Sequence, residues 1–218
     1  MERLKIAILY QDPFIVLVNK PCGIMTEPDQ FGHDNVLDIL KAQLNPQQHK
    51  NFFLQNVHRL DRPVSGVLAF ALKPSVVKKW NAEFRGDSIQ KEYLARVSAA
   101  LPAPRGELQH YLWKDQKNWR SEVKATPFAH AQPVRLAYEV LKESEGNFLL
   151  RIELFTGKYH QIRAQLALVG CPIIGDEKYG STVSYQPNAI ALHAHRLTFR
   201  HPARGNTLSI DAPWTKAQ

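Results

Sequence analysis

The chain carries, at residues 58–66, the stretch HRLDRPVSG, which places the carboxylate of Asp61 between the guanidinium groups of Arg59 and Arg62. This stretch leads directly into the apolar run VLAFAL at residues 67–72, a pattern typical of a strand buried on both faces of a sheet. A proline-stiffened loop anchored on such a strand holds Asp61 at a fixed point among positive charges. We therefore expect the arginines to bind phosphate and Asp61 to stay ionised as a nucleophile or base. Three such residues alone would equally describe a solvated salt-bridge turn.

The composition points to a globular protein with a polyanionic partner. The chain has 218 residues, of which 44% are hydrophobic and 22% charged, values that are ordinary for a domain with its own core. Its 28 Lys and Arg exceed its 20 Asp and Glu, which gives a formal net charge of +8. Such an excess bears on binding and association rate rather than on fold. Because no repeat or linker interrupts the sequence, we expect a single domain over residues 1–218.

The sequence also predicts a soluble, cytoplasmic protein. Cys22 and Cys171 lie far apart without C-x-x-C spacing, so we expect two reduced thiols. No apolar run reaches the roughly 18 residues that a membrane span needs, and the first residues lack the apolar core of a signal peptide. We expect no membrane partner, and a monomer.

Apolar periodicity predicts more strands than helices. One helix is expected after a cap at Asp34 or Asn35, a second between a cap at Ser75 and Gly86, and a third from Thr156 or Gly157 to Val169. Strands are expected at residues 6–10, 15–19, 67–72, 93–97, 134–140, 148–154 and 192–199. Since several of them are joined by short turns, we predict an α+β fold with a mixed, mainly antiparallel sheet and flanking helices.

Several enzyme classes are disfavoured by missing motifs. The sequence has no G-x-x-x-x-G-K, G-x-G-x-x-G, H-E-x-x-H or G-x-S-x-G, which argues against nucleotide hydrolases, dehydrogenases, zincins and serine hydrolases. His193 and His195 would share one face of a strand, but no third ligand accompanies them at a suitable spacing. We expect neither a metal nor a cofactor.

Four separated motifs together resemble one family. HRLDRPVSG resembles the signature H-R-L-D-[variable]-x-[S/T]-S-G of the RluA-like (large-subunit-type) pseudouridine synthases. The stretches NKPCG at residues 19–23, KEY at 91–93 and TGKYHQIR at 156–163 resemble that family's N-K-P-x-G, K-x-Y and T-G-R-x-H-Q-I-R motifs, in the same order. The resemblance runs from Ile8 to Ile210. It implies the pseudouridine-synthase α+β fold, in a compact form without an N-terminal S4 module.

The resemblance assigns three catalytic residues. It implies that Asp61 is the catalytic carboxylate, that Arg163 pairs with it, and that Tyr93 stacks on the target uracil. On a helix, Arg163 would share a face with His160 and Tyr159, three and four residues back. A cation beside Asp61 would lower the pKa of its carboxyl and keep it ionised. A solvent-facing cationic helix is the alternative interpretation of the same residues.

Substrate binding is expected from five further residues. Arg59 is implied to help displace the base from its stack, and Arg62, Lys20, Lys158 and His160 complete the substrate-binding set. Lys158 departs from the family, which usually has Arg there; Lys cannot form a bidentate fork, so a phosphate contact at this position is altered.

The sequence thus predicts an enzyme that isomerises specific uridines in structured rRNA or tRNA. Residues 113–124 interleave aromatic and cationic side chains, which suits contact with RNA and equally suits a basic hairpin with Trp packed beneath it. Two other functions stay open: a non-catalytic RNA-binding protein on the same scaffold, and a glycosylase that uses Asp61 with an activated water. The sequence does not identify the RNA or the modified uridine.

Overall fold

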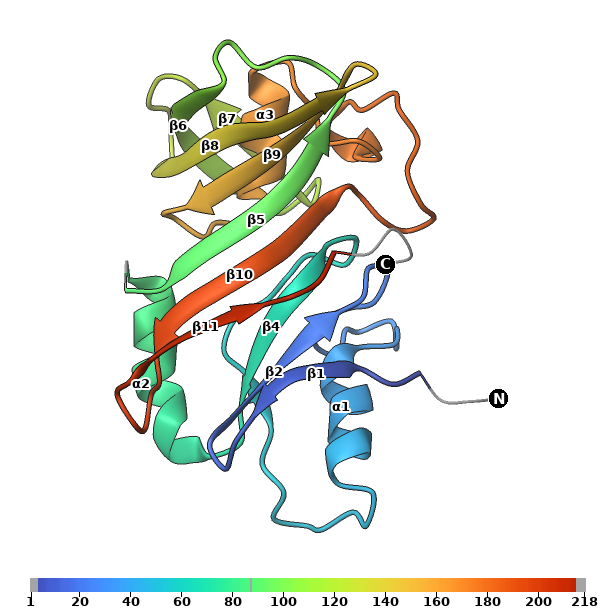
Figure 1. Ribbon diagram of the computed structural model, residues 1–218, viewed down its shortest axis with the longest axis vertical. Coiled ribbons are helices and arrows are strands. Elements are labelled where there is room, and N and C mark those ends of the chain that lie inside the picture. The colour runs from blue at the N-terminus through green and yellow to red at the C-terminus, as the bar shows by residue number, and fades with distance from the viewer. Residues whose placement is uncertain (1–3, 87, 215–218) are drawn as a thin grey trace. The chain divides into compact units, whose positions relative to one another are not determined.

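A computed structural model describes residues 4–86 and 88–214 and divides the chain into two compact units (Figure 1). The first unit takes its described residues from the segments up to Ile89 and from Ala194 onward. The second unit, Gln90–His193, is inserted between these two segments. The single catalytic domain expected over residues 1–218 stays a prediction, and within it the chain folds as two units.

The first unit is built on a sheet whose central strand follows directly from the signature stretch. β4 is buried along its whole length and lies between β2 and β10, as the apolar run predicted. β2 and β4 pair antiparallel from Ile15↔Ala71 to Lys20↔Gly66. The strands of this unit are β1 (Ala7–Gln11), β2 (Ile15–Lys20), β3 (Gln55–Asn56), β4 (Ser65–Ala71), β10 (Leu192–Arg200, which begins at the boundary between the units) and β11 (Thr207–Asp211).

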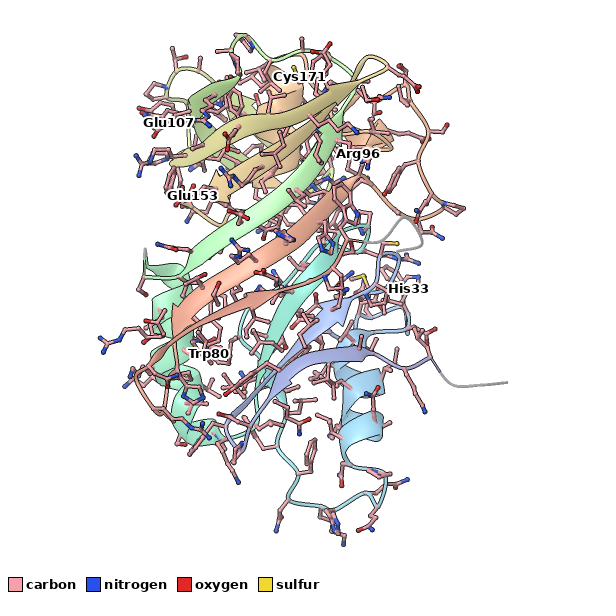
Figure 2. All side chains as sticks on the ribbon, viewed as in Figure 1. His33, Trp80, Arg96, Glu107, Glu153 and Cys171 are labelled. Carbon is pink, nitrogen blue, oxygen red and sulfur yellow. The ribbon has the colours of Figure 1, made fainter. Side chains whose placement is uncertain are left out.

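Two helices belong to the first unit. α1 (Val36–Leu44) begins where predicted, because the Asn35 side chain accepts a hydrogen bond from the amide of Asp38. α2 (Pro74–Arg85) does not begin at a Ser75 cap; Lys73 is its N-cap residue and Pro74 occupies the first helical position, which suits a residue without an N–H. Trp80 of α2 is fully buried and packs against Phe199 of β10 (Figure 2).

The second unit is an antiparallel sheet with a helix packed against it. Its strands lie in the order β5-β9-β8-β6-β7, and α3 contacts β6 and β7 (Figure 1). Its elements are β5 (Gln90–Val97), β6 (Arg105–Asp115), β7 (Arg120–Lys124), β8 (Gln132–Ser144), β9 (Asn147–Leu154), α3 (Gln161–Leu168) and the 3₁₀ helix η1 (Glu177–Tyr179).

The predicted fold class is confirmed, with differences in detail. α3 begins at Gln161 and not at Thr156 or Gly157, because His160 has a left-handed backbone (φ 52°). Tyr159 and His160 therefore precede the helix and do not share a helical face with Arg163. Strands β3, β6, β7 and β11 were not predicted. The described helices have at most 12 residues and are too short and polar to span a membrane.

Candidate active site

Asp61 opens a tight turn that leads into β4. The amide of Val64 donates to the carbonyl of Asp61 at 3.0 Å, with Arg62 and Pro63 as the two central residues. The Asp61 side chain is half-buried, whereas Val64 and the strand that follows are buried. The carboxylate is therefore carried on a short loop that leads into a strand buried along its whole length.

The buried side chain of Lys20 binds the backbone of this turn. Its side chain is fully buried (0% exposed), and Nζ donates to the carbonyls of Pro21, Arg62 and Val64 at 2.9, 3.2 and 2.7 Å. Burial lowers the pKa of Lys20 to about 7, against the opposing effect of the nearby Asp61 carboxylate. The expectation that Lys20 binds phosphate is therefore revised, since its ammonium is enclosed and directed at the backbone of the turn.

The segment that follows Lys20 fixes the backbone on both sides of Asp61. The Thr26 hydroxyl donates to the carbonyl of Leu60 at 3.1 Å and accepts from its amide at 3.2 Å. The Gly23 amide donates to the carbonyl of Arg62, and Arg62 Nε donates to the carbonyl of Gly23, both at 2.8 Å. The two sequence motifs at residues 19–23 and 58–66 are thus halves of one structure.

The remaining signature residues have separate tasks. Arg59 is 64% exposed and forms an ion pair with Glu27 at 2.8 Å. The ring of His58 stacks on Phe84 at 4.5 Å, and its Nε2 accepts a hydrogen bond from the amide of Ala69 at 3.1 Å. A ring nitrogen that accepts from an amide carries no proton. Because the ring is held by both contacts, we assign His58 a structural role in the loop.

Gly66 is required by a close approach of two strands. Its φ is +119°, and a Cβ placed there would lie 2.2 Å from the carbonyl oxygen of Ala194 in β10. No side chain fits at that distance. The Ser-Gly pair of the signature therefore ends the Asp61 loop where β4 meets β10.

In the second unit, Arg163 is held by a buried carboxylate that the sequence did not reveal. Arg163 Nε donates to Asp176 Oδ2 at 2.7 Å, and Nη2 donates to Oδ1 at 2.9 Å. Both side chains are buried, at 6% and 1% exposed. The partner lies 13 residues beyond Arg163, outside the motif that carries Arg163, so spacing gave no signal for it.

His160 belongs to the same buried cluster and not to an exposed surface. Its ring stacks on Tyr159 with 3.8 Å between centroids, and Nδ1 lies 2.9 Å from the Tyr179 hydroxyl. Burial, reinforced by the charges of Arg163 and Lys178, lowers the pKa of His160 to about 3, so the ring is neutral. We therefore revise its role from substrate binding to support of the cluster.

The other predicted site residues of the second unit are more accessible. Tyr93 lies on β5 opposite Ile152 of β9 and is half-buried. Lys158 is exposed, in the turn before α3. Residues 113–124 include a hairpin formed by β6 and β7, in which Lys114 pairs with Ser121 and the Trp119 side chain is 62% exposed. Within the described part of the chain, no three His, Cys, Asp or Glu side chains are grouped as metal ligands would be.

Comparison with known proteins identifies the family of this chain. Residues 14–168 match the family described as RNA pseudouridylate synthase. The chain belongs to the RNA pseudouridylate synthase family. The resemblance seen in the four sequence motifs is thereby confirmed. The protein is accordingly an enzyme of the isomerase class, a pseudouridine synthase.

Individual pseudouridine synthases extend this likeness over nearly the whole chain. The dual-specificity RNA pseudouridine synthase RluA of Escherichia coli K12 is 32% identical over 95% of this chain and 93% of its own length. The ribosomal large subunit pseudouridine synthase C of Vibrio cholerae O1 is also 32% identical, over 98% of this chain and 67% of its own length. The human RNA pseudouridylate synthase domain containing 4 shares the fold, with a TM-score of 0.79, 22% identity, and coverage of 96% of this chain and 88% of that one.

Proposed function

We propose that this pseudouridine synthase isomerises specific uridines in structured rRNA or tRNA, with Asp61 as its catalytic carboxylate. The observation that carries the proposal is the fixed backbone around Asp61: Thr26 holds Leu60 on one side, and Lys20 and Gly23 hold Arg62 on the other. The relatives named for the ribosomal large subunit and for dual-specificity RNA modification support RNA as the substrate.

The reaction requires one group at the sugar and a site for the detached base. The bond between C1′ and N1 breaks, the uracil turns, and C5 bonds to C1′. The hydrogen on C5 leaves as a proton, and N1, freed from the sugar, takes up a proton. Asp61 serves this sequence as an ionised carboxylate, by attack on C1′, by addition to C6 of the base or by removal of a sugar proton. No atom is gained or lost overall, and the product has the mass of the substrate.

Two side chains of the second unit complete the proposed catalytic set. Tyr93 offers a flat ring for the uracil and a hydroxyl for proton transfer at C5. The family motif assigns Arg163 as the partner of the catalytic carboxylate.

RNA binding falls to exposed cations. Arg59, Arg62 and Lys158 are exposed and suit phosphate or base contacts, whereas the buried Lys20 and His160 support the site from within. The ion pair of Arg59 with Glu27 is exposed, and such pairs contribute only about 0–1 kcal/mol. The free-energy cost of breaking this ion pair when Arg59 binds RNA is therefore small. A low cost suits a residue that is implied to enter the base stack. We propose that the enzyme acts as a monomer in the cytoplasm.

The substitution Asp61→Asn tests the proposal. It keeps the size of the side chain and removes its charge, so turnover should be lost while RNA affinity and the melting temperature stay close to those of the wild type. Tritium release from RNA labelled at C5 of uridine measures turnover. Asp211→Asn is the matched control, because Asp211 lies exposed on β11 of the same unit.

Each outcome of this experiment has one meaning. Pseudouridine formed by the wild type and lost in Asp61→Asn supports the proposal. Substantial turnover by Asp61→Asn contradicts the role of Asp61. Release of free uracil by the wild type identifies a glycosylase, and RNA binding without any product identifies a non-catalytic protein.

A further inference from the structure

Arg163 is enclosed by a cluster that restricts its guanidinium from several directions. Asp176 takes two of its five N–H donors in a bidentate pair, and the ring of Tyr179 lies 5.1 Å from its guanidinium carbon. The pair with Asp176 uses Nε and Nη2 of the guanidinium and does not involve Nη1. A buried, planar and doubly bonded guanidinium has one orientation, unlike an exposed arginine.

Asp176 and Tyr179 are themselves fixed to each other. The amide of Tyr179 donates to the carbonyl of Asp176 at 3.0 Å, and the amide of Ser181 donates to the same carbonyl at 3.1 Å. The amide of Asp176 donates to the carbonyl of Ile173 at 2.9 Å. One short turn at η1 thus presents both side chains to Arg163.

The Tyr179 hydroxyl ties this turn to two other elements. It accepts a hydrogen bond from the amide of Ser121, in β7, at 2.8 Å. Nδ1 of His160 lies 2.9 Å from the same hydroxyl, and the two groups share a hydrogen bond whose donor depends on the tautomer of the ring. Burial raises the pKa of Tyr179, so the hydroxyl keeps its proton. Tyr179 therefore joins the β6–β7 hairpin, the residue before α3 and the guanidinium of Arg163.

We propose that Asp176 and Tyr179 are positioning residues for the reaction: they hold the guanidinium of Arg163 in the single orientation that its catalytic role requires. This inference rests on the proposed function and adds two residues that the motif around Arg163 does not contain. Arg163 has a long, rotatable stem, so its catalytic value depends on the groups that fix its direction. Both residues act through Arg163 and are not expected to touch the substrate.

Asp176→Asn and Tyr179→Phe separate the two contributions. Asn keeps one acceptor but turns an N–H₂ group toward the guanidinium, which breaks the fork; kcat should fall on the order of 10²-fold, as expected for a misplaced catalytic group. Phe keeps the ring beneath Arg163 and loses only the hydroxyl, so kcat should fall less. The KM for RNA should stay near the wild-type value in both.

A matched control exists on the surface. Arg196 and Asp211 form the same bidentate pair, with both side chains partly exposed on β10 and β11. Asp211→Asn removes the same interaction and should leave kcat unchanged. Thermal melting of all variants distinguishes a loss of folding from a loss of the Arg163 orientation. If Asp176→Asn does not fold, the kcat of Tyr179→Phe tests the proposal instead.

A double-mutant cycle with Arg163→Met, measured by single-turnover tritium release, decides the matter. If Asp176 and Tyr179 act through Arg163, their substitutions should cause no further loss once Arg163 is absent. Losses that multiply in the cycle, or kcat values of the single variants equal to that of the wild type, would overturn the positioning role. Such results would leave the proposed function standing, because that function is decided separately by Asp61→Asn.

Discussion

Thr26 and Leu60 exchange two hydrogen bonds through a single hydroxyl, one to the carbonyl and one from the amide of the residue before Asp61. Both groups are buried, so nothing else nearby replaces the hydroxyl. The contact joins two segments separated by 34 residues.

Thr26→Val should therefore weaken both fold and turnover. The substitution keeps the shape and leaves two buried backbone groups unsatisfied, at about 1–3 kcal/mol each. We expect a loss of roughly 2–6 kcal/mol in the free energy of unfolding, measured in urea, together with a lower kcat. Thr26→Ser, which keeps the hydroxyl, should retain most of both. Equal behaviour of the Val and Ser variants would contradict the clamp.

Gly66→Ala should be far more damaging than its size suggests. The new methyl group would lie 2.2 Å from the carbonyl of Ala194, and neither strand can move without breaking the sheet. A loss of about 4 kcal/mol or more is expected. Gly146→Ala is the matched control: its φ is also positive (+74°), nothing lies within 4 Å, and only the backbone strain of about 1–2 kcal/mol applies. Similar melting temperatures for the two variants would rule out the close approach.

Lys20 should give the enzyme a stability that rises at alkaline pH. Its pKa is lowered to about 7 in the folded protein from its ordinary value of 10.5, so between these pH values the unfolded chain binds the extra proton. Stability then increases with pH by up to about 1.4 kcal/mol per unit and is lowest below pH 7. The free energy of unfolding of wild type minus that of Lys20→Met, followed from pH 7 to 10, measures this. A difference that stays flat or declines would show that Lys20 keeps its proton throughout.

The β6–β7 hairpin should contribute to the salt dependence of RNA binding. If roughly five phosphates of a single-stranded loop are neutralised, log K should fall with log salt at a slope of about −3.5. Replacing the exposed Lys117 and Arg120 together should flatten this slope by about one unit, with little effect on turnover at saturating RNA. Identical slopes for variant and wild type would assign the hairpin a structural role alone.

The sequence predicted the buried core of the fold better than its edges. The strands β2, β4, β5, β9 and β10 and the helix α1 follow from continuous apolar runs or a clear cap. β6 and β7 were missed because their alternation is interrupted by polar and aromatic residues that face partly outward. The start of α3 was predicted too early because the amino-acid sequence does not show that His160 adopts a left-handed backbone.

The sequence predicted which residues belong to the candidate site, but not which groups they bind. The motifs identified Lys20, Asp61 and Arg163, but charge alone suggested that Lys20 faces phosphate. Only the structure shows that the ammonium group of Lys20 is enclosed by three backbone carbonyls. Only the structure shows that Arg163 binds the carboxylate of Asp176, 13 residues further along the chain. Such contacts depend on where distant segments meet, which local patterning does not record.

The insertion of one unit into the other sets an order of assembly during synthesis. Residues 90–193 form a contiguous unit, whereas the first unit is completed only by the segment from Ala194 onward, which is synthesised last. Strand β4, which bears the Asp61 turn, gains its neighbour β10 only then, when the Ala194 carbonyl comes to rest against Gly66. The strand that follows the Asp61 turn thus gains its last neighbour only when the end of the chain has been made.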